Sequence, residues 1–331
     1  MKILITGGCG YIGSHVAISL LQAGHIIKII DNFSNSSKNI INEISRITEK
    51  KIDVIECDIR DQRYISKILD STEIDAVFHF AGLKSVSESV NDPLRYYENN
   101  VSGSISLFNE ILKNKIKKII FSSSATVYSN KNKPPFNESH SLSYNSHPYG
   151  QSKVIIEKVL NDICKSDTQM SVGILRYFNP IGAHESGKIG DRPNNIPNNL
   201  IPYIIKVLEG KLSTLNIYGN DYDTKDGSGV RDYIHINDLT EGHIKAFEKI
   251  NGESGYNIWN LGSGIGYSVF EVLELFEEIT GKKIPHEVVA RRKGDVAVSL
   301  ADPSKAMQEL NWKPKENLRS MIKDSLKTIS K

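Results

Sequence analysis

The sequence predicts an α/β fold, in which a doubly wound parallel sheet is followed by a smaller mixed α/β domain at the C-terminus. Three observations carry this prediction. Short, continuously apolar segments alternate with helical patterns over the first half of the chain. A glycine-rich turn joins the first apolar segment to the first helical pattern. Beyond about residue 179 the chain becomes rich in proline, asparagine and glycine, which is typical of a less regular domain.

Five segments are predicted to be buried strands, because their apolar cores are continuous, as expected when helices cover both faces of a parallel sheet. They are residues 2–6, 26–31, 54–57, 76–80 and 118–122. The helical patterns between and after them span residues 11–23, 38–49, 64–69, 93–113 and 149–164. Residues 172–177 are expected to rejoin the sheet. In such a fold, ligands bind at the carboxyl ends of the strands.

The predicted boundary falls at residue 179, giving a first domain of residues 1–178 and a second of residues 179–331, with some later segments returning to the first sheet. Residues 219–229 are rich in glycine and aspartate, which predicts an exposed loop. Further strands and helices are expected near residues 257–261, 269–280 and 303–310.

Composition excludes several classes of protein. A length of 331 residues fits about two domains. The 41 basic and 39 acidic residues give a net charge of +2, so nothing indicates a nucleic-acid or membrane partner. No uninterrupted apolar run is long enough to span a bilayer. Cys9, Cys57 and Cys164 lack the spacing of a zinc site and are expected to be free thiols in a reducing cytoplasm.

The turn after the first strand reads Gly7-Gly8-Cys9-Gly10-Tyr11-Ile12-Gly13 and opens the first helix. Glycines at this spacing permit a tight turn, close backbone approach to a pyrophosphate and close helix–strand packing. The helix N-terminus then offers N–H groups to the anion. The sequence therefore predicts a Rossmann-type dinucleotide site that includes Gly7, Gly10 and Gly13.

Asp31, at the end of the second strand, favours NAD as the dinucleotide. A carboxylate there accepts hydrogen bonds from the adenosine ribose and repels a 2′-phosphate, which disfavours NADP. The alternative is an aspartate that only caps a turn, since Asn32 and Ser34 follow. Asp58 and Ile59, after the third strand, are candidates to flank the adenine, and a simple strand-end aspartate remains the alternative for Asp58.

Tyr149 and Lys153 form a Y-x-x-x-K pair, whose spacing places both side chains on one helical face. A free phenol is a poor base at neutral pH, but a nearby ammonium and a positive nicotinamide ring favour its ionised form. Ser124, just past the fifth strand, is placed to hold the same substrate oxygen. The alternative for the pair is an ordinary surface contact on a helix.

Together these features resemble the UDP-glucose 4-epimerases, within the extended short-chain dehydrogenase/reductase superfamily, essentially from end to end. The matching stretches are residues 6–15, FHFAGLK (78–84), YYENNV (96–101), FSSSATVY (121–128), LRYFNPIGA (175–183), IPNNLIPY (196–203), VRDYIHIND (230–238), NLGSG (260–264) and RRKGD (291–295). Several lie in the second domain, where substrate specificity resides.

The resemblance implies an isomerase that reversibly inverts C4 of a UDP-hexose. Tyr149 would take the 4-hydroxyl proton, Lys153 would hold the nicotinamide ribose, and Ser124 and Thr126 would bind the reacting hydroxyl. Residues implied around NAD are Tyr11, Ile12, Asp31, Asn32, Asp58, Ile59, Phe80, Ala81, Gly82, Lys84, Asn99, Ser122, Tyr149, Lys153 and Phe178. Residues implied around the UDP-sugar are Lys84, Ser124, Tyr149, Asn179, Asn199, Leu200, Asn216, Tyr218, Arg231, Arg292, Asp295 and Ser299.

Each residue of the second domain has a structural alternative. Asn179 could be only a turn former, Tyr218 only a core residue, and Arg231 a local ion-pair partner of Asp232. Arg292 could lie on a solvated surface with its neighbour. Asn216 is the least secure member, since a backbone contact would leave no signal in the side chain.

Ser299 is a departure from the family pattern, which places a large tyrosine there in members restricted to non-acetylated sugars. A small residue leaves room beside the sugar C2 substituent, so N-acetylated UDP-hexoses are expected to fit. Side chains that fill the gap are the alternative. The family is usually homodimeric, and residues 93–113 and 149–164 would supply the paired helices.

Two other functions compete with epimerisation. A nucleotide-sugar 4,6-dehydratase also oxidises C4, but family dehydratases carry an Asp-Glu pair where this chain has Ala125-Thr126. A catalytically silent NAD-binding regulatory protein would not need an intact Ser124, Tyr149 and Lys153.

Overall fold

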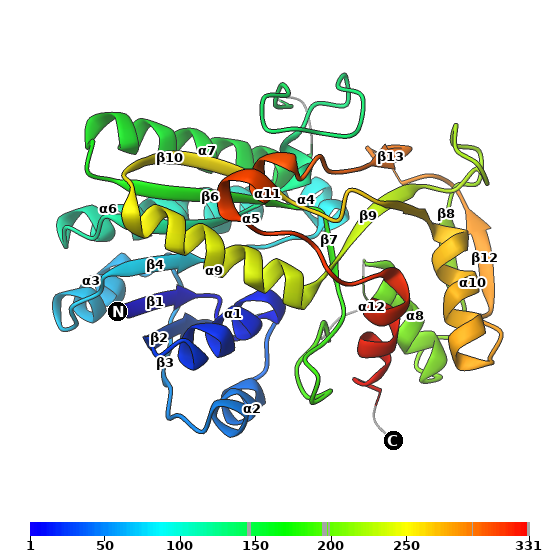
Figure 1. Cartoon of the computed structure of the whole chain (residues 1–331), viewed down its shortest axis with the longest axis horizontal. Coiled ribbons are helices and arrows are strands. Elements are labelled where there is room, and N and C mark those ends of the chain that lie inside the picture. Colours follow the sequence, from blue (N-terminus) through cyan, green and yellow to red (C-terminus); the bar gives the residue numbers. More distant parts are fainter. Residues whose placement is uncertain (144–146, 194–196, 198, 293, 330–331) are drawn as a thin grey trace. The chain divides into compact units, whose positions relative to one another are not determined.

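The computed structural model describes residues 1–143, 147–193, 197, 199–292 and 294–329. Ile196, Asn198 and Lys293, from the stretches that carry the resemblance, lie outside these ranges. The chain forms two compact units (Figure 1). Unit 1 comprises residues 1–129, 141–176 and 240–259, and unit 2 comprises residues 130–140, 177–239 and 260–331. The chain therefore crosses between units at more places than the predicted boundary at residue 179.

Unit 1 is built on a seven-stranded sheet in the order β10-β6-β5-β4-β1-β2-β3. Its strands are β1 (Lys2–Thr6), β2 (Ile26–Asp31), β3 (Asp53–Glu56), β4 (Ala76–His79), β5 (Lys118–Ser124), β6 (Ser171–Tyr177) and β10 (Gly255–Leu261). The pairs β1–β2, β1–β4, β2–β3 and β4–β5 are parallel. The order of the first six strands is that of a doubly wound dinucleotide-binding sheet, so the predicted fold class is confirmed.

Helices pack on both faces of this sheet (Figure 1). They are α1 (Tyr11–Gln22), α2 (Asn39–Thr48), α3 (Gln62–Asp70), α4 (Val86–Asn91), α5 (Pro93–Tyr96), α6 (Gly103–Lys113), α7 (Pro148–Ser166) and α9 (Ile236–Gly252). Val77 belongs to the core that α3, α6 and α7 cover. Its neighbour Phe78 lies 5.2 Å, centroid to centroid, from Phe247 of α9. Because successive strand residues face opposite sides, the β4 strand is buried on both faces.

The helix predicted over residues 93–113 is interrupted. Residues Tyr97–Ser102 form a π-helix, η1, between α5 and α6. Asn99 and Asn100 lie in this wide turn, and the Asn100 amide donates to the Leu83 carbonyl and to Ser152 Oγ, each at 3.0 Å. Single π-turns inside helices are frequent at functional sites. The π-helix thus coincides with hydrogen bonds from the Asn100 side chain to segments distant in the sequence. The helical periodicity of the sequence cannot predict such bonds.

Unit 2 contains short strands and three packed helices. Its strands are β7 (Asn179–Ile181), β8 (Leu215–Tyr218), β9 (Val230–His235), β11 (Gly266–Ser268), β12 (His286–Val289) and β13 (Val298–Ser299). β9 pairs with β7, β11 and β13, while β12 pairs in parallel with β8. A separate core joins β7, β8, β9 and β11 to α8 (Leu200–Leu208), α10 (Val269–Thr280) and α12 (Leu318–Leu326), and α11 (Ser304–Leu310) follows β13.

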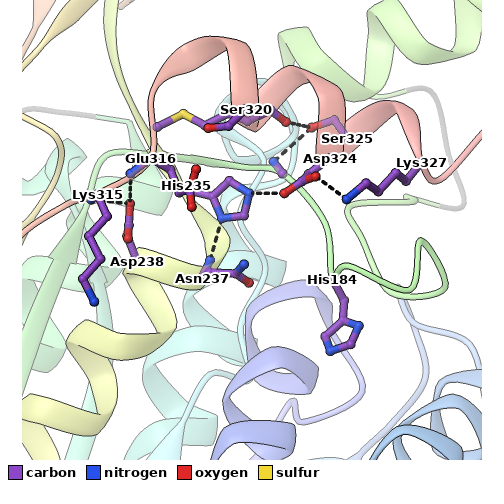
Figure 2. A network of polar contacts seen from close by, with 12 residues as sticks. His184, His235, Asn237, Asp238, Lys315, Glu316, Ser320, Asp324, Ser325 and Lys327 are labelled. Carbon is purple, nitrogen blue, oxygen red and sulfur yellow. Dashed lines mark hydrogen bonds and ion pairs between the residues drawn. The ribbon is translucent and has the colours of Figure 1, made fainter.

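A buried histidine ties the C-terminal helix to β9 (Figure 2). His235 Nε2 lies 3.1 Å from Asp324 Oδ2, and the Asn237 N–H donates to His235 Nδ1 at 3.0 Å. Since Nδ1 accepts, the proton of a neutral ring resides on Nε2 and is donated to Asp324. Gly182 N–H donates to Ser325 Oγ at 3.0 Å beside it. These bonds fix α12 against β9 and β7.

Among the helices that the structure describes, none is both long enough and apolar enough to cross a bilayer.

Candidate active site

The predicted cofactor residues of unit 1 gather at one edge of its sheet. They follow or end strands whose pairing is parallel, so their carboxyl ends meet at that edge. Residues 7–13 follow β1, Asp31 ends β2 and Asn32 follows it, Asp58 and Ile59 follow β3, residues 80–84 follow β4, and Ser122 and Ser124 lie at the end of β5. Asn99 lies in η1. Phe178 follows β6, is buried, and belongs to unit 2.

The glycine turn is packed too tightly for side chains at two positions. Gly7 has φ +69°, and a Cβ there would lie 2.7 Å from the Ala81 nitrogen. A Cβ at Gly13 would lie 2.4 Å from the Gly7 oxygen. The turn therefore lies close against the residues that follow β4 and against its own backbone. The helix α1 begins at Tyr11 with no side-chain cap on its first N–H groups. The backbone donors and the absent Cβ atoms fit a pyrophosphate.

Asp31 holds the turn and keeps acceptor capacity. Its carboxylate accepts from the Cys9 N–H, the Phe33 N–H and Ser36 Oγ, each at 2.9 Å. An ionised carboxylate has about four acceptor sites, so one is left for a ribose hydroxyl. Asp31 therefore stabilises the turn, as the alternative interpretation had it. This role leaves room for the ribose contact, which stays a prediction.

Asp58 is bound by a residue that the sequence did not single out. Arg60 donates to it through Nε at 2.9 Å and through a terminal nitrogen at 2.8 Å, and Asn32 Nδ2 donates at 2.9 Å. The hydrogen bond from the Arg60 side chain is the main cause that lowers the pKa of Asp58 to about 2. The pair fixes a carboxylate at the edge beside Asn32.

Asn100 joins the loop after β4 to the helix that carries the tyrosine. Besides its two donated bonds, its Oδ1 accepts from the Leu83 N–H at 2.8 Å and from Asn99 Nδ2 at 3.0 Å. It is buried, and a Cβ at Gly82 would lie 3.3 Å from its Oδ1. The sequence analysis did not single out Asn100, although it lies in the YYENNV stretch.

Two other predicted cofactor residues follow β4. The ring centroids of Phe80 and His243 are 5.2 Å apart, and Lys84 is exposed.

Ser124 acts on Tyr149 by lowering the pKa of its phenol through a side-chain hydrogen bond. Ser124 Oγ also accepts from the Thr126 N–H at 3.2 Å and from Thr126 Oγ1 at 3.0 Å. Because Thr126 donates both of these bonds, it orients Ser124 and leaves the Ser124 proton to be donated to another group.

Burial raises the pKa of Tyr149, and the bond from Ser124 opposes that rise. The protein's own groups therefore favour the neutral phenol of Tyr149, and the predicted ionisation also requires the positive nicotinamide ring. The reason is desolvation, which penalises the ionised phenol more than Ser124 stabilises it. Further positive charge at the ring is needed to ionise it.

Lys153 is almost completely buried one helical turn beyond Tyr149. Its Nζ donates to the Ser122 carbonyl at 2.7 Å and lies 4.7 Å from the centroid of the Phe121 ring. Burial lowers the pKa of Lys153 to about 8, and the charge of Glu157 opposes that change. The Lys153 side chain is therefore a buried amine held at the end of β5, one helical turn from the tyrosine.

In unit 2, Arg231 and Arg292 have specific neighbours. An Arg231 terminal nitrogen contacts Asp295 Oδ1 closely, and the Arg292 guanidinium carbon lies 3.8 Å from the Tyr218 ring centroid. Arg231 does not pair with Asp232 as the alternative had it. Asp232 points to the other side of β9, as alternation requires, and accepts backbone N–H bonds from Ser263, Gly264 and Ala301. The two predicted diphosphate ligands thus lie beside a carboxylate and an aromatic face.

Asn216 has a buried polar atom that no described residue satisfies. Its Oδ1 is buried and has no hydrogen-bond partner among the described residues. A buried, unsatisfied amide oxygen costs stability, so its retention calls for an explanation such as a ligand donor. Asn216 lies on β8 two residues before Tyr218. The residue that the sequence supported least is therefore one of three in unit 2, with His140 and Tyr222, that hold a buried polar atom without a partner among the described residues.

The remaining predicted substrate residues are spread over three elements of unit 2. Asn179 starts β7, opposite Tyr233 of β9. Asn199 is exposed and precedes α8, which begins at Leu200. Ser299 is partly buried on β13, in register with Arg231 of β9.

A parallel sheet in this strand order, a glycine turn and a Ser-Tyr-Lys cluster define a Rossmann-type protein of the extended short-chain dehydrogenase/reductase class. A family model described as GDP-mannose 4,6 dehydratase matches residues 4–325. A UDP-glucose 4-epimerase from Bacillus subtilis (strain 168) is 50% identical over 325 residues, 98% of this chain and 96% of that protein. The chain belongs to the UDP-glucose 4-epimerase family.

Two solved structures are similar over nearly the whole chain. The UDP-glucose 4-epimerase from Bifidobacterium longum in complex with NAD+ and UDP has a TM-score of 0.96 and 43% identity, covering 99% of this chain and 98% of that one. The UDP-Glc/GlcNAc 4-epimerase from Campylobacter jejuni has a TM-score of 0.85 and 35% identity, covering 98% of each chain.

Proposed function

We propose that this protein is an NAD-dependent isomerase that reversibly inverts C4 of UDP-hexoses, interconverting UDP-glucose and UDP-galactose. The observation that carries the proposal is a cluster of three side chains in the unit that also holds the glycine turn. Ser124 at the end of β5 is oriented by Thr126. Tyr149 lies one helical turn before Lys153, which is buried and donates to the Ser122 carbonyl. Membership in the UDP-glucose 4-epimerase family supports the substrate class.

The residues that would hold NAD are those gathered at the carboxyl edge of the sheet in unit 1. The glycine turn would bind the pyrophosphate through backbone N–H groups, and the spare acceptor site of Asp31 would bind the adenosine ribose. When bound, NAD supplies a reversible hydride acceptor for C4 and, in its oxidised form, a positive charge near the phenol.

Tyr149 is the proton acceptor and donor of the proposed reaction. As a phenolate it takes the proton of the 4-hydroxyl while that carbon becomes a ketone, and it later returns the proton to the same oxygen. Ser124, oriented by Thr126, holds this oxygen during both steps. The Lys153 ammonium stabilises the phenolate. The net reaction changes only the configuration at C4, so proton and hydride balance without a second substrate.

In unit 2 the proposed contacts hold the nucleotide. Arg231 and Arg292 would bind the diphosphate, since guanidinium groups match phosphate oxygens in pairs. The buried Oδ1 of Asn216 would accept a hydrogen bond from a donor group of the ligand. Because these contacts hold the UDP part, the 4-keto sugar can turn over without leaving the protein, which inversion requires.

A 4,6-dehydratase is the competing reaction, and the description of the matching family model favours considering it. Elimination of water needs a carboxylic acid close to the oxidised carbon. The two residues that follow Ser124 are Ala125 and Thr126, neither of which is an acid. Thr126 donates a hydrogen bond to Ser124. Without that acid, epimerisation is the better-supported outcome. A silent NAD-binding protein would have no use for the ordered Thr126, Ser124 and Tyr149 chain.

The proposal is tested with the purified protein, no NAD added, and UDP-galactose or UDP-glucose as substrate. We expect the other C4 epimer to form, and Tyr149→Phe to lower turnover by about 10²–10⁴-fold while binding of UDP is kept. Tyr64→Phe, at an exposed tyrosine of the same unit, is the matched control and should stay active. Absence of either epimer with wild-type protein, or a 6-deoxy-4-keto product, refutes the proposal.

We infer further that N-acetylated UDP-hexoses are also substrates. The support is Ser299, a small and partly buried residue on β13, in register with Arg231. The similar Campylobacter jejuni enzyme is named for both UDP-Glc and UDP-GlcNAc.

We infer that the protein is a homodimer in which the predicted segments, residues 93–113 and 149–164, pair with those of a second copy. Leu94, Ile105 and Leu112 in the first segment are exposed, and Leu94 is 72% exposed. Exposed apolar side chains of this size are typical of a subunit interface. The mass in solution should be that of a dimer, and Leu94→Glu should yield monomer; a wild-type monomer contradicts the inference.

The free thiols of Cys9, Cys57 and Cys164 support a cytoplasmic location.

A further inference from the structure

One buried ion pair in unit 1 is not used by the proposed chemistry. Arg176 on β6 donates to both oxygens of Glu157, at 3.1 Å through Nε and at 2.7 Å through a terminal nitrogen. Each side chain is 2% exposed. Burying two charges costs free energy that their attraction offsets only with good geometry, and such pairs are weak evidence of a purely stabilising role.

Glu157 lies one helical turn beyond Lys153 on α7. At this spacing the side chains are neighbours on one face of the helix, with about 6 Å between their Cβ atoms. The charge of Glu157 opposes the loss of the Lys153 proton that burial promotes. Tyr149, Lys153 and Glu157 thus form one row along α7.

Glu157 also reaches the strand that carries Ser124. Ser123 Oγ donates to Glu157 Oε1 at 2.5 Å. Ser122, the residue before Ser123, accepts the hydrogen bond from Lys153 through its carbonyl. Ser124, the residue after Ser123, lowers the pKa of Tyr149. The carboxylate therefore holds the strand at the point between the two catalytic contacts.

We propose that Glu157 is a positioning residue of the epimerisation site: its carboxylate, fixed by Arg176, keeps the Lys153 ammonium charged and holds the end of β5 in place. The inference rests on the proposed function. The buried Glu157–Arg176 pair would then set the pH range over which Lys153 stays charged and the enzyme is active.

The other titratable groups around Lys153 and Glu157 do not take over this role. His79 on β4 is buried, and burial lowers its pKa to about 3, so it is neutral at working pH. Tyr256 on β10 donates to the Glu157 backbone carbonyl at 3.1 Å, and Tyr128 bonds Arg176 at 3.0 Å. Burial raises the pKa of Tyr256 and of Cys164, so both are uncharged. Glu157 is thus the anion facing Lys153 among the groups described around it.

The test is the pH dependence of kcat/KM for UDP-galactose in Glu157→Gln. Glutamine keeps the shape and still accepts from Ser123, but it lacks the charge. We expect the alkaline limb, where Lys153 loses its proton, to move to lower pH by about 0.5–1 unit. Glu157→Asp should restore most of the shift. A structural role alone would reduce activity at all pH values and leave the limb in place.

Two further variants keep the test decisive. If Glu157→Gln leaves Arg176 unpaired and this single variant fails to fold, Glu157→Gln/Arg176→Met carries no unpaired charge and should show a smaller shift of the same sign. Ser123→Ala removes the bond to the strand but not the charge, so it should lower kcat without moving the limb. Asp162→Asn, an exposed charge on α7, should change neither.

An unmoved limb in folded Glu157→Gln or in the double variant overturns the inference, and so does an equal shift in Asp162→Asn. Inactive wild-type protein would refute the proposed function instead, so the two failures are distinguishable.

Discussion

The Arg292 guanidinium carbon lies 3.8 Å from the centroid of the Tyr218 ring. A second stack follows the same pattern, since Arg291 lies 4.1 Å from the Tyr222 ring centroid. The cause is the parallel pairing of β8 with β12, which places Tyr218 opposite Val289, so both strands end together. The arginines that follow β12 therefore meet the aromatic residues at the end of β8.

Arg292→Lys should weaken UDP binding by about tenfold. Lysine keeps the charge, but it lacks the flat guanidinium that stacks on Tyr218 and binds phosphate oxygens in pairs. Calorimetric titration with UDP measures the effect. Arg319→Lys, at an exposed ion pair of the same unit, should leave the affinity unchanged. Equal affinity of Arg292→Lys and wild type would remove Arg292 from the site.

Gly13→Ala should reduce the NAD content of the purified protein severalfold. The new methyl group would lie 2.4 Å from the Gly7 oxygen, so the turn that is proposed to bind the pyrophosphate must shift. The measurement is NAD released per chain on denaturation. Gly252→Ala, whose Cβ would meet no atom within 4 Å, is the control. Full NAD content in a folded Gly13→Ala protein contradicts the role of the turn.

Asn216→Leu should weaken UDP binding by about tenfold without loss of thermal stability. The substitution removes a buried oxygen that has no partner among the described residues, and such a group costs about 1–3 kcal/mol. Thermal unfolding and UDP titration are read together. A lowered Tm with unchanged affinity for UDP would show that Asn216 has a purely structural role.

Ser299→Tyr should lower turnover of N-acetylated UDP-hexoses at least tenfold relative to UDP-galactose. The larger side chain would occupy the volume that a C2 acetamido group is expected to need. Ser299→Ala removes the hydroxyl without adding bulk and should keep the wild-type ratio. If the ratio for Ser299→Tyr also stays unchanged, residue 299 does not control access of the acetamido group.

Lys153 makes stability depend on pH. Burial lowers its pKa to about 8 from 10.5, so between these values the unfolded chain binds more protons than the folded one. Stability therefore rises with pH across this window, by about 2–3 kcal/mol from this group. Denaturant unfolding across the window should show the rise in wild type and in Lys158→Met, an exposed lysine of α7. Lys153→Met should lack it, and an equal rise in Lys153→Met would contradict the buried charge.

Local patterns were sufficient for much of unit 1. The strand at Lys2–Thr6 has the predicted bounds, and the glycine turn and the Tyr149–Lys153 spacing lie where the sequence placed them. These features depend on residues within one turn or one strand of each other. Asn100, which bonds Leu83 and Ser152, was not foreseen, because its partners are far apart in sequence.

The sequence by itself determined the fold class, the family and the residue types of the catalytic cluster, because short-range periodicity and motif spacing encode them. Only the tertiary structure decided which charges pair and which polar atoms are left over. It joined Arg231 to Asp295 and Glu157 to Arg176, and it left Asn216 Oδ1 without a partner among the described residues. The physical reason is that desolvation and hydrogen bonding depend on what surrounds a side chain in space, and strand pairing and helix packing create those surroundings between segments distant in the chain.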